Sequence, residues 1–262
     1  MHSKKVRMIT SFAFLASLLW IFALGWSIKD YLFGTASQSS VSQDTEQPAE
    51  SSSGLKIIAL GDSLTRGTGD IEGKGYVGYV SDQLKQSGKD VSLINLGIKG
   101  LTSSELVEQM KQKEIERQIG QADIILMTIG GNDLFLGGQS LTDLSEASIS
   151  GLEEAFLNHL KTILTSIRAV NTEATVYLLG LYNPFSEFQN GELMSTVVRN
   201  WNSKTAETLA QHSRAVLVPT YDLFQLNAEK LLFTDHFHPN EIGYRLMAER
   251  VAALIADAGG QS

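Results

Sequence analysis

The chain has 262 residues, of which 43% are hydrophobic and 19% are charged, and this composition of a packed globular protein excludes wholesale disorder. The formal net charge of -8 argues against nucleic acid as the main partner, since the phosphate backbone requires a basic surface. The absence of cysteine excludes disulfides, thiolate catalysis and cysteine-based zinc sites.

The first 33 residues combine a basic head with a long apolar segment. Residues 8–26 carry no charge, and as a helix they would extend for about 28 Å, against roughly 30 Å for the hydrocarbon core of a bilayer. A signal peptide usually has an apolar region of only about 7–15 residues, so residues 1–33 are predicted to form a transmembrane anchor, with a cleaved signal peptide as the alternative. The basic head should stay in the cytoplasm. We therefore expect a single-pass protein of the cell membrane with its remaining residues on the extracellular face, or a secreted protein if the segment is cleaved.

The next segment, 34–54, is rich in serine and has almost no large apolar residue. It cannot bury enough apolar surface to offset the entropy lost on ordering, so it is predicted to be a disordered linker. The length of the remaining segment, 55–262, suits one folded domain.

Within 55–262, short apolar runs alternate with helical patterns. This alternation predicts a three-layer α/β domain with a mainly parallel sheet of five strands. In such sheets, ligands bind at the edge formed by the carboxyl ends of the strands. We expect strands at 57–60, 91–95, 124–129, 175–181 and 215–218, and helices at 76–86, 103–119, 149–170, 192–212 and 240–258.

Polar residues that suit acyl transfer follow several of these strands. Ser63 comes after the first strand, and Asp235 and His238 come after the fifth. A serine nucleophile needs a base and a carboxylate that orients the base, and these three residues supply them. The oxyanion needs hydrogen-bond donors, which the backbone N–H groups of Ser63 and Gly100 and the side-chain amide of Asn132 could provide.

Four sequence blocks resemble those of the GDSL (SGNH) family of esterases and lipases, and they occur in that family's order. The blocks are GDSL at 61–64, Gly100, GGND at 130–133, and the pair Asp235 and His238, with Gly97 as an alternative to Gly100. The resemblance covers residues 55 to about 258 and implies a flavodoxin-like SGNH hydrolase fold with strand order 2-1-3-4-5. It also implies a triad of Ser63, His238 and Asp235, an oxyanion hole of Ser63, Gly100 and Asn132, and a reaction that needs no cofactor and no metal.

The substrate class is open at this point. Leu134 and Phe135 follow the third strand, and Tyr182 and Phe185 follow the fourth, so these residues either line an acyl pocket or belong to the core. We expect a serine esterase that hydrolyses acyl esters as a lipase or lysophospholipase does, with a small-molecule or lipid ester as its partner. The alternatives are an O-acetyl esterase acting on cell-wall glycans, a thioesterase, and an anchored binding module with an inactive site.

A metal site is the other interpretation of the last block. Asp235, His236 and His238 have side chains that ligate metals. No further histidine or acidic cluster lies near them in sequence, because His159 and His212 fall in predicted helices, and we prefer the triad.

Overall fold

The computed structural model describes residues 54–135, 145–188 and 190–259. The chain divides between Ser52 and Ser53, and the described residues all belong to the second part. The predicted anchor and almost all of the predicted linker lie outside the described residues. Within the ranges that are described, no helix is both long enough and apolar enough to cross a membrane.

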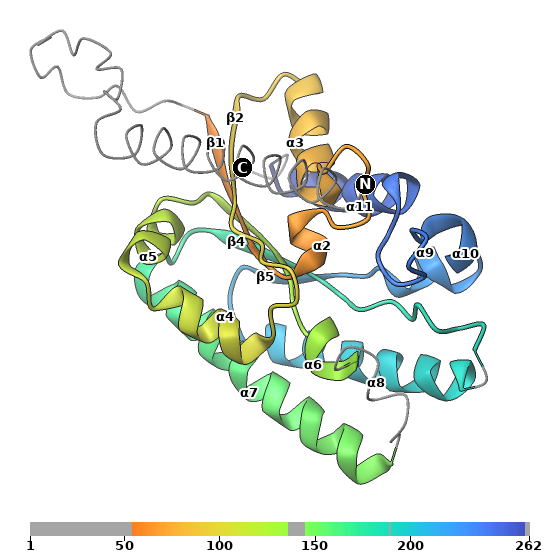
Figure 1. The fold of residues 1–262 in the computed structure, drawn as a ribbon. Coiled ribbons are helices and arrows are strands. Elements are labelled where there is room, and N and C mark those ends of the chain that lie inside the picture. Colours follow the sequence, from red (N-terminus) through yellow and green to blue (C-terminus); the bar gives the residue numbers. More distant parts are fainter. Residues whose placement is uncertain (1–53, 136–144, 189, 260–262) are drawn as a thin grey trace, which may run out of the picture. The chain divides into compact units, whose positions relative to one another are not determined.

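One sheet of five parallel strands forms the centre of the domain, in the order β2-β1-β3-β4-β5 (Figure 1). The predicted strand order is confirmed, and every strand pair is parallel. The central strands are apolar without alternation because helices cover both faces of the sheet. The strands are β1 (Leu55–Gly61), β2 (Val91–Asn95), β3 (Ile124–Thr128), β4 (Thr175–Leu179) and β5 (Ala215–Val218).

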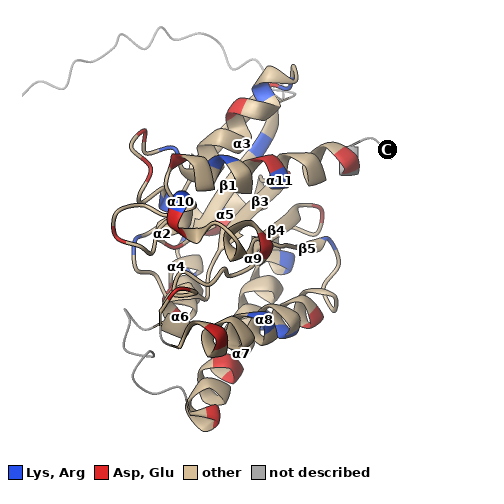
Figure 2. Cartoon of the chain, turned by 90° about the vertical axis from the view of Figure 1, so that its right-hand side faces the viewer, with Lys and Arg blue, Asp and Glu red and all other residues tan. Residues whose placement is uncertain are grey.

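Helices lie on both sides of the sheet (Figure 1), and a hydrophobic core lies on each of its faces. Helices α3 (Gly75–Gln86) and α11 (Glu241–Gly259) cover the face that carries Ile57 and Ala59. The opposite face, which carries Ile58 and Leu60, is covered by helices α4 (Ser103–Met110), α5 (Lys113–Gly120), α7 (Glu146–Val170) and α8 (Gly191–Leu209). Acidic and basic residues are interspersed along α3, α8 and α11 (Figure 2). The remaining helices are α2 (Ser63–Arg66), α6 (Gly131–Phe135), α9 (Tyr221–Gln225) and α10 (Ala228–Leu231).

The prediction of one helix over 103–119 is wrong, because α4 and α5 are separate helices. Met110 packs in the core, and an unbroken helix would next place Glu114 on the same buried side. A break at Gln112, whose backbone is extended with φ -74° and ψ 126°, instead turns Ile115 towards the core. The break between the two helices keeps apolar side chains buried and charged side chains in water.

Candidate active site

Ser63 lies at the carboxyl edge of the sheet, immediately after β1. Gly61 has φ 123°, and a Cβ atom at this position would lie 1.9 Å from the carbonyl oxygen of Thr128 on β3. Only glycine therefore permits β1 to turn this close to its neighbour. Asp62 then caps the short helix α2, because its Oδ1 accepts the Leu64 N–H at 3.0 Å. This turn leaves Ser63 as the first residue of α2, almost completely buried.

A continuous series of hydrogen bonds connects Asp235, His238 and Ser63. His238 Nδ1 lies 2.7 Å from Asp235 Oδ2, and His238 Nε2 lies 2.8 Å from Ser63 Oγ. An ionised carboxylate only accepts hydrogen bonds, so Nδ1 carries the proton and Nε2 faces the serine hydroxyl as an acceptor. The other carboxylate oxygen, Asp235 Oδ1, accepts the backbone N–H groups of Phe237 and His238, each at 3.0 Å. The imidazole is thus held in the tautomer that can take a proton from Ser63.

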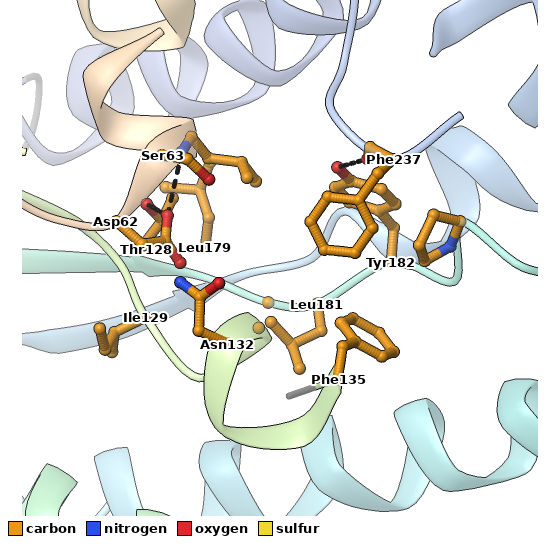
Figure 3. Close-up of a pocket in the computed structure, with 14 residues that line it drawn as sticks. Asp62, Ser63, Thr128, Ile129, Asn132, Phe135, Leu179, Leu181, Tyr182 and Phe237 are labelled. Carbon is orange, nitrogen blue, oxygen red and sulfur yellow. Dashed lines mark hydrogen bonds between the residues drawn. The ribbon is translucent and has the colours of Figure 1, made fainter. Parts of the chain in front are cut away.

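The loop that carries His238 is held from several directions. The Phe233 N–H donates to the carbonyl oxygen of His238 at 2.7 Å, and the Tyr182 hydroxyl donates to that of Phe237 at 2.7 Å (Figure 3). Gly69, with φ 96°, lies against the same loop, and a Cβ atom there would lie 2.5 Å from the carbonyl oxygen of Pro239. These contacts leave the histidine little room to move away from Ser63.

Two aspartates of the site have shifted pKa values in opposite directions. Burial alone would raise the pKa of Asp235, but the hydrogen bonds from the His238 side chain and from two backbone N–H groups outweigh it and hold the pKa below its ordinary value. Burial raises the pKa of Asp62 from 3.8 to about 6, and the charge of Asp133 adds to the shift, although bonds from Thr128 and Leu64 oppose it. Asp235 is therefore ionised at neutral pH.

Asn132 projects from α6 towards the edge on which Ser63 lies. Its Nδ2 donates to the carbonyl oxygen of Leu101 at 2.8 Å, which leaves a second amide hydrogen for another acceptor. Within the described part of the chain, the Gly100 N–H has no hydrogen-bond partner. The Gly97 N–H, in contrast, already donates to Asn95 Oδ1 at 3.0 Å. The geometry favours Gly100 over Gly97 as a donor for an oxyanion.

A hollow of about 440 Å³, including the space open to solvent at its mouth, lies beside Ser63. Figure 3 shows the polar residues of its lining on one side and the rings of Phe135, Tyr182 and Phe237 on the other. Such an arrangement places a polar reacting group and an apolar chain next to each other. The lining residues are Asp62, Ser63, Leu64, Thr128, Ile129, Gly131, Asn132, Phe135, Leu179, Gly180, Leu181, Tyr182, Pro184 and Phe237.

Comparison with known proteins identifies the family. Residues 59–246 match the model of the GDSL-like lipase/acylhydrolase family. The chain belongs to this family. It is 30% identical over 209 residues to the spore germination lipase LipC of Bacillus licheniformis, covering 76% of this chain and 95% of that protein. It is also 36% identical over 212 residues to YpmR of Bacillus subtilis (strain 168), and this match covers 78% of this chain and 83% of YpmR.

A solved structure supports the same assignment. The lipase Lip_vut3 from a goat rumen metagenome is 29% identical to the chain, has a TM-score of 0.66, and is matched over 76% of this chain and 96% of its own. The predicted SGNH hydrolase fold is confirmed, and the chain is a carboxylic ester hydrolase of the GDSL family.

Two of the four predicted pocket residues line the hollow of this GDSL hydrolase, and the other two do not. Phe135 and Tyr182 line the hollow. Phe185 is not among the lining residues and packs against Phe135, with the two rings edge to face and 5.4 Å between centroids. Leu134 is completely buried in the core and is not among the lining residues.

The sequence interpretation missed several lining residues of the GDSL hydrolase. Phe237 precedes His238 inside the last block, so its position was a signal that it lies near the site. Thr128 ends β3, and its hydroxyl donates to Asp62 Oδ1 at 2.7 Å, a contact that only strand pairing creates. The predicted strand 175–181 includes Leu181, but β4 ends at Leu179 and Leu181 lines the hollow.

The metal interpretation has no geometric support in this hydrolase. Both ring nitrogens of His238 are engaged, one with Asp235 and one with Ser63. His236 has φ 55° and is exposed. Over the described ranges, no three His, Asp or Glu side chains lie close enough together to hold a metal ion.

Proposed function

We propose that this GDSL-family hydrolase is a serine esterase that cleaves esters of apolar acyl chains, as a lipase or lysophospholipase does. The observation that carries the proposal is the uninterrupted series of hydrogen bonds from Asp235 through His238 to Ser63, at 2.7 and 2.8 Å, beside a hollow with an apolar wall. This geometry suits nucleophilic attack without further rearrangement of the base.

In the proposed reaction, Ser63 Oγ attacks the ester carbonyl carbon while His238 Nε2 takes the hydroxyl proton. Asp235 holds the ring and stabilises the imidazolium. The bond to the leaving oxygen then breaks, and His238 passes the proton to the alcohol that departs. In the second half, His238 removes a proton from water as the water attacks the acyl group on Ser63, and the serine regains its proton when the acid leaves.

The negative charge on the carbonyl oxygen needs donors in both halves of the reaction. We assign this role to the second amide hydrogen of Asn132 and to the N–H groups of Ser63 and Gly100. Support comes from the Gly100 N–H, which has no hydrogen-bond partner among the described residues, and from the position of Asn132 in the lining. Loss of one such donor typically costs about 3–4 kcal/mol of transition-state stabilisation.

The acyl part of the proposal is supported by a row of aromatic rings that leads away from the base. The ring centroids of Phe237 and His238 lie 5.1 Å apart. The next centroids in the row are 5.9 Å apart in each case, from Phe237 to Phe185 and from Phe185 to Phe188. Phe188 is 60% exposed, so the row runs from the reacting atoms to the surface. An apolar chain bound along it would be shielded from water over most of its length.

Exposed apolar residues gather on the same edge. On the described surface, every exposed large hydrophobic residue lies between the carboxyl end of a strand and the first turn of the next long helix. These residues are Ile71, Ile98, Phe188, Leu193, Leu226, Phe233 and Ile242.

Two measurements test the proposal. A fluorophosphonate probe should label the full chain, and Ser63→Ala should abolish labelling; an unlabelled wild type would favour an inactive binding module. A series of p-nitrophenyl esters from acetyl to palmitoyl should show kcat/KM rising by up to about fourfold per methylene, since burial of one methylene contributes about 0.8 kcal/mol. A strict preference for acetyl would favour an O-acetyl esterase, and faster cleavage of matched thioesters would favour a thioesterase.

We also propose that residues 1–33 hold the enzyme at the outer face of the cell membrane. The support is the uncharged segment 8–26 and the basic residues before it. Intact protein in the membrane fraction, retaining residues 1–33, is the expected result. A soluble mature form that begins near Ser37 would show cleavage of a signal peptide instead.

A further inference from the structure

A second cluster of Ser, His and Asp side chains lies outside the catalytic series. Ser103, the first residue of α4, is completely buried, and its hydroxyl donates to Asp133 Oδ1 of α6. The same Ser103 Oγ lies 2.9 Å from Nδ1 of His159 on α7. The Ser103 backbone N–H also donates to both carboxylate oxygens of Asp133, at 3.2 and 2.9 Å. The cluster thus connects three separate helices, and its members Ser103 and His159 are 56 positions apart in the sequence.

The direction of each hydrogen bond in this cluster follows from simple chemistry. Ser103 has one hydroxyl hydrogen, which it donates to Asp133 Oδ1. His159 Nδ1 must therefore be the donor to Ser103 Oγ. Ser103 is not a second nucleophile, because it is buried and its hydroxyl proton is given to a carboxylate rather than to a base.

The cluster lies next to two of the predicted oxyanion donors, the side chain of Asn132 and the loop that carries Gly100. Asn132 precedes Asp133, and its amide donates to the carbonyl oxygen of Leu101 at 2.8 Å. Two consecutive residues of α6 thus bind the segment that begins directly after Gly100. At its other end this loop is held to β1, because the Ile98 N–H donates to the Gly61 carbonyl oxygen at 2.8 Å. Gly100 therefore lies between a point at which the loop is bonded to β1 and a point at which it is bonded to α6, and these two sets of hydrogen bonds hold it in place.

We propose that Ser103, Asp133 and His159 are positioning residues that hold the loop carrying Gly100 against the helix carrying Asn132, and so set the spacing of the oxyanion hole. The proposal rests on the proposed function, because it concerns donors to an acyl-transfer oxyanion. Donors that must be preorganised for a transition state are sensitive to small displacements, and a misplacement of about 1 Å can cost about 100-fold in rate.

The sharpest test uses a pair of substitutions at His159, which is half-buried and distant in sequence from the reacting groups. His159→Leu removes the donor to Ser103, whereas His159→Asn keeps an N–H donor near the position of Nδ1. His212→Leu is the matched control, because this histidine is also half-buried and has no side-chain hydrogen bond among the described residues. Each variant is made in the full chain and assayed with a short p-nitrophenyl ester.

We expect His159→Leu to lower kcat by about 10- to 100-fold with KM within about twofold of wild type, because the lost interaction acts only in the transition state. His159→Asn should restore kcat to within about threefold, and His212→Leu should leave it unchanged. A purely structural role would lower the thermal midpoint without this split between kcat and KM. An unchanged kcat in His159→Leu, or no recovery in His159→Asn, overturns the proposal.

A second variant covers the case in which His159→Leu does not fold. Ser103→Ala removes the hydroxyl but keeps the backbone N–H bonds to Asp133, and it should show the same fall in kcat at unchanged KM. A wild-type kcat in Ser103→Ala also overturns the proposal. Failure of the proposed function is distinguishable, because it would appear as a wild-type chain that the fluorophosphonate probe does not label.

Discussion

Asp235→Asn replaces the carboxylate that orients the catalytic base by an amide of the same shape. Asp235 Oδ1 accepts two backbone N–H groups at 3.0 Å, so the oxygen of the new amide must occupy that position. The amide nitrogen then faces His238 Nδ1 in place of Oδ2. Because an amide N–H donates, Nδ1 must become the acceptor and the ring proton moves to Nε2. His238 would then donate to Ser63 rather than accept its proton.

The expected loss in kcat is about 10⁴-fold, or about 5 kcal/mol of transition-state stabilisation, which is the scale seen when a triad histidine is held in the wrong tautomer. The effect on stability should be small. The Asp235 side chain is 40% exposed, and exposed ion pairs contribute only about 0–1 kcal/mol. Activity and stability should therefore separate in this variant.

The assay is hydrolysis of p-nitrophenyl butyrate together with the rate of fluorophosphonate labelling, and thermal unfolding is followed in parallel. Asp222→Asn is the matched control, since this exposed carboxylate pairs with Arg250 at 2.6 Å and has no contact with His238. The control should retain wild-type kcat. A kcat for Asp235→Asn within tenfold of wild type would refute the assignment of Asp235 as the orienting acid.

Three further predictions concern the surroundings of the triad. Asn132→Ala should lower kcat by about 10²- to 10³-fold in ester hydrolysis with KM nearly unchanged, and a loss confined to KM would contradict its role as an oxyanion donor. Asp62 has its pKa raised to about 6, so its neutral form is favoured in the folded state, and stability is lost as the pH rises from the ordinary value of 3.8 through 6. Relative to wild type, Asp62→Asn should therefore gain on the order of 3 kcal/mol in the free energy of unfolding between pH 4 and pH 8, measured by denaturant unfolding. An equal difference at both pH values would show that folding does not shift the pKa of Asp62. Gly69→Ala and Gly73→Ala should each lower the free energy of unfolding by about 1 kcal/mol, because both glycines have positive φ. Only the Cβ atom of Gly69→Ala would contact the His238 loop, so only this variant should also lower kcat. Equal kcat values in the two variants would count against that contact.

The sequence by itself determined the sheet and the chemistry brought to its edge. Unbroken apolar runs such as 124–127 are typical of strands buried on both faces, and their alternation with amphipathic helices allows few arrangements. Ser63, Asn132 and the pair Asp235 and His238 could be predicted because acyl transfer needs these residue types, and because short local turns deliver them at strand ends.

Other features were decided only by the tertiary structure. The break between α4 and α5 follows from which residues must face the core, and helix propensity along 103–119 does not show it. The bond between Ser103 and His159 joins residues 56 positions apart, and such contacts leave no periodic pattern in a single sequence. The raised pKa of Asp62 likewise depends on burial and on the charge of Asp133 across the sheet edge. Local patterns can report which groups are present, whereas distances, burial and protonation depend on how separate segments pack together.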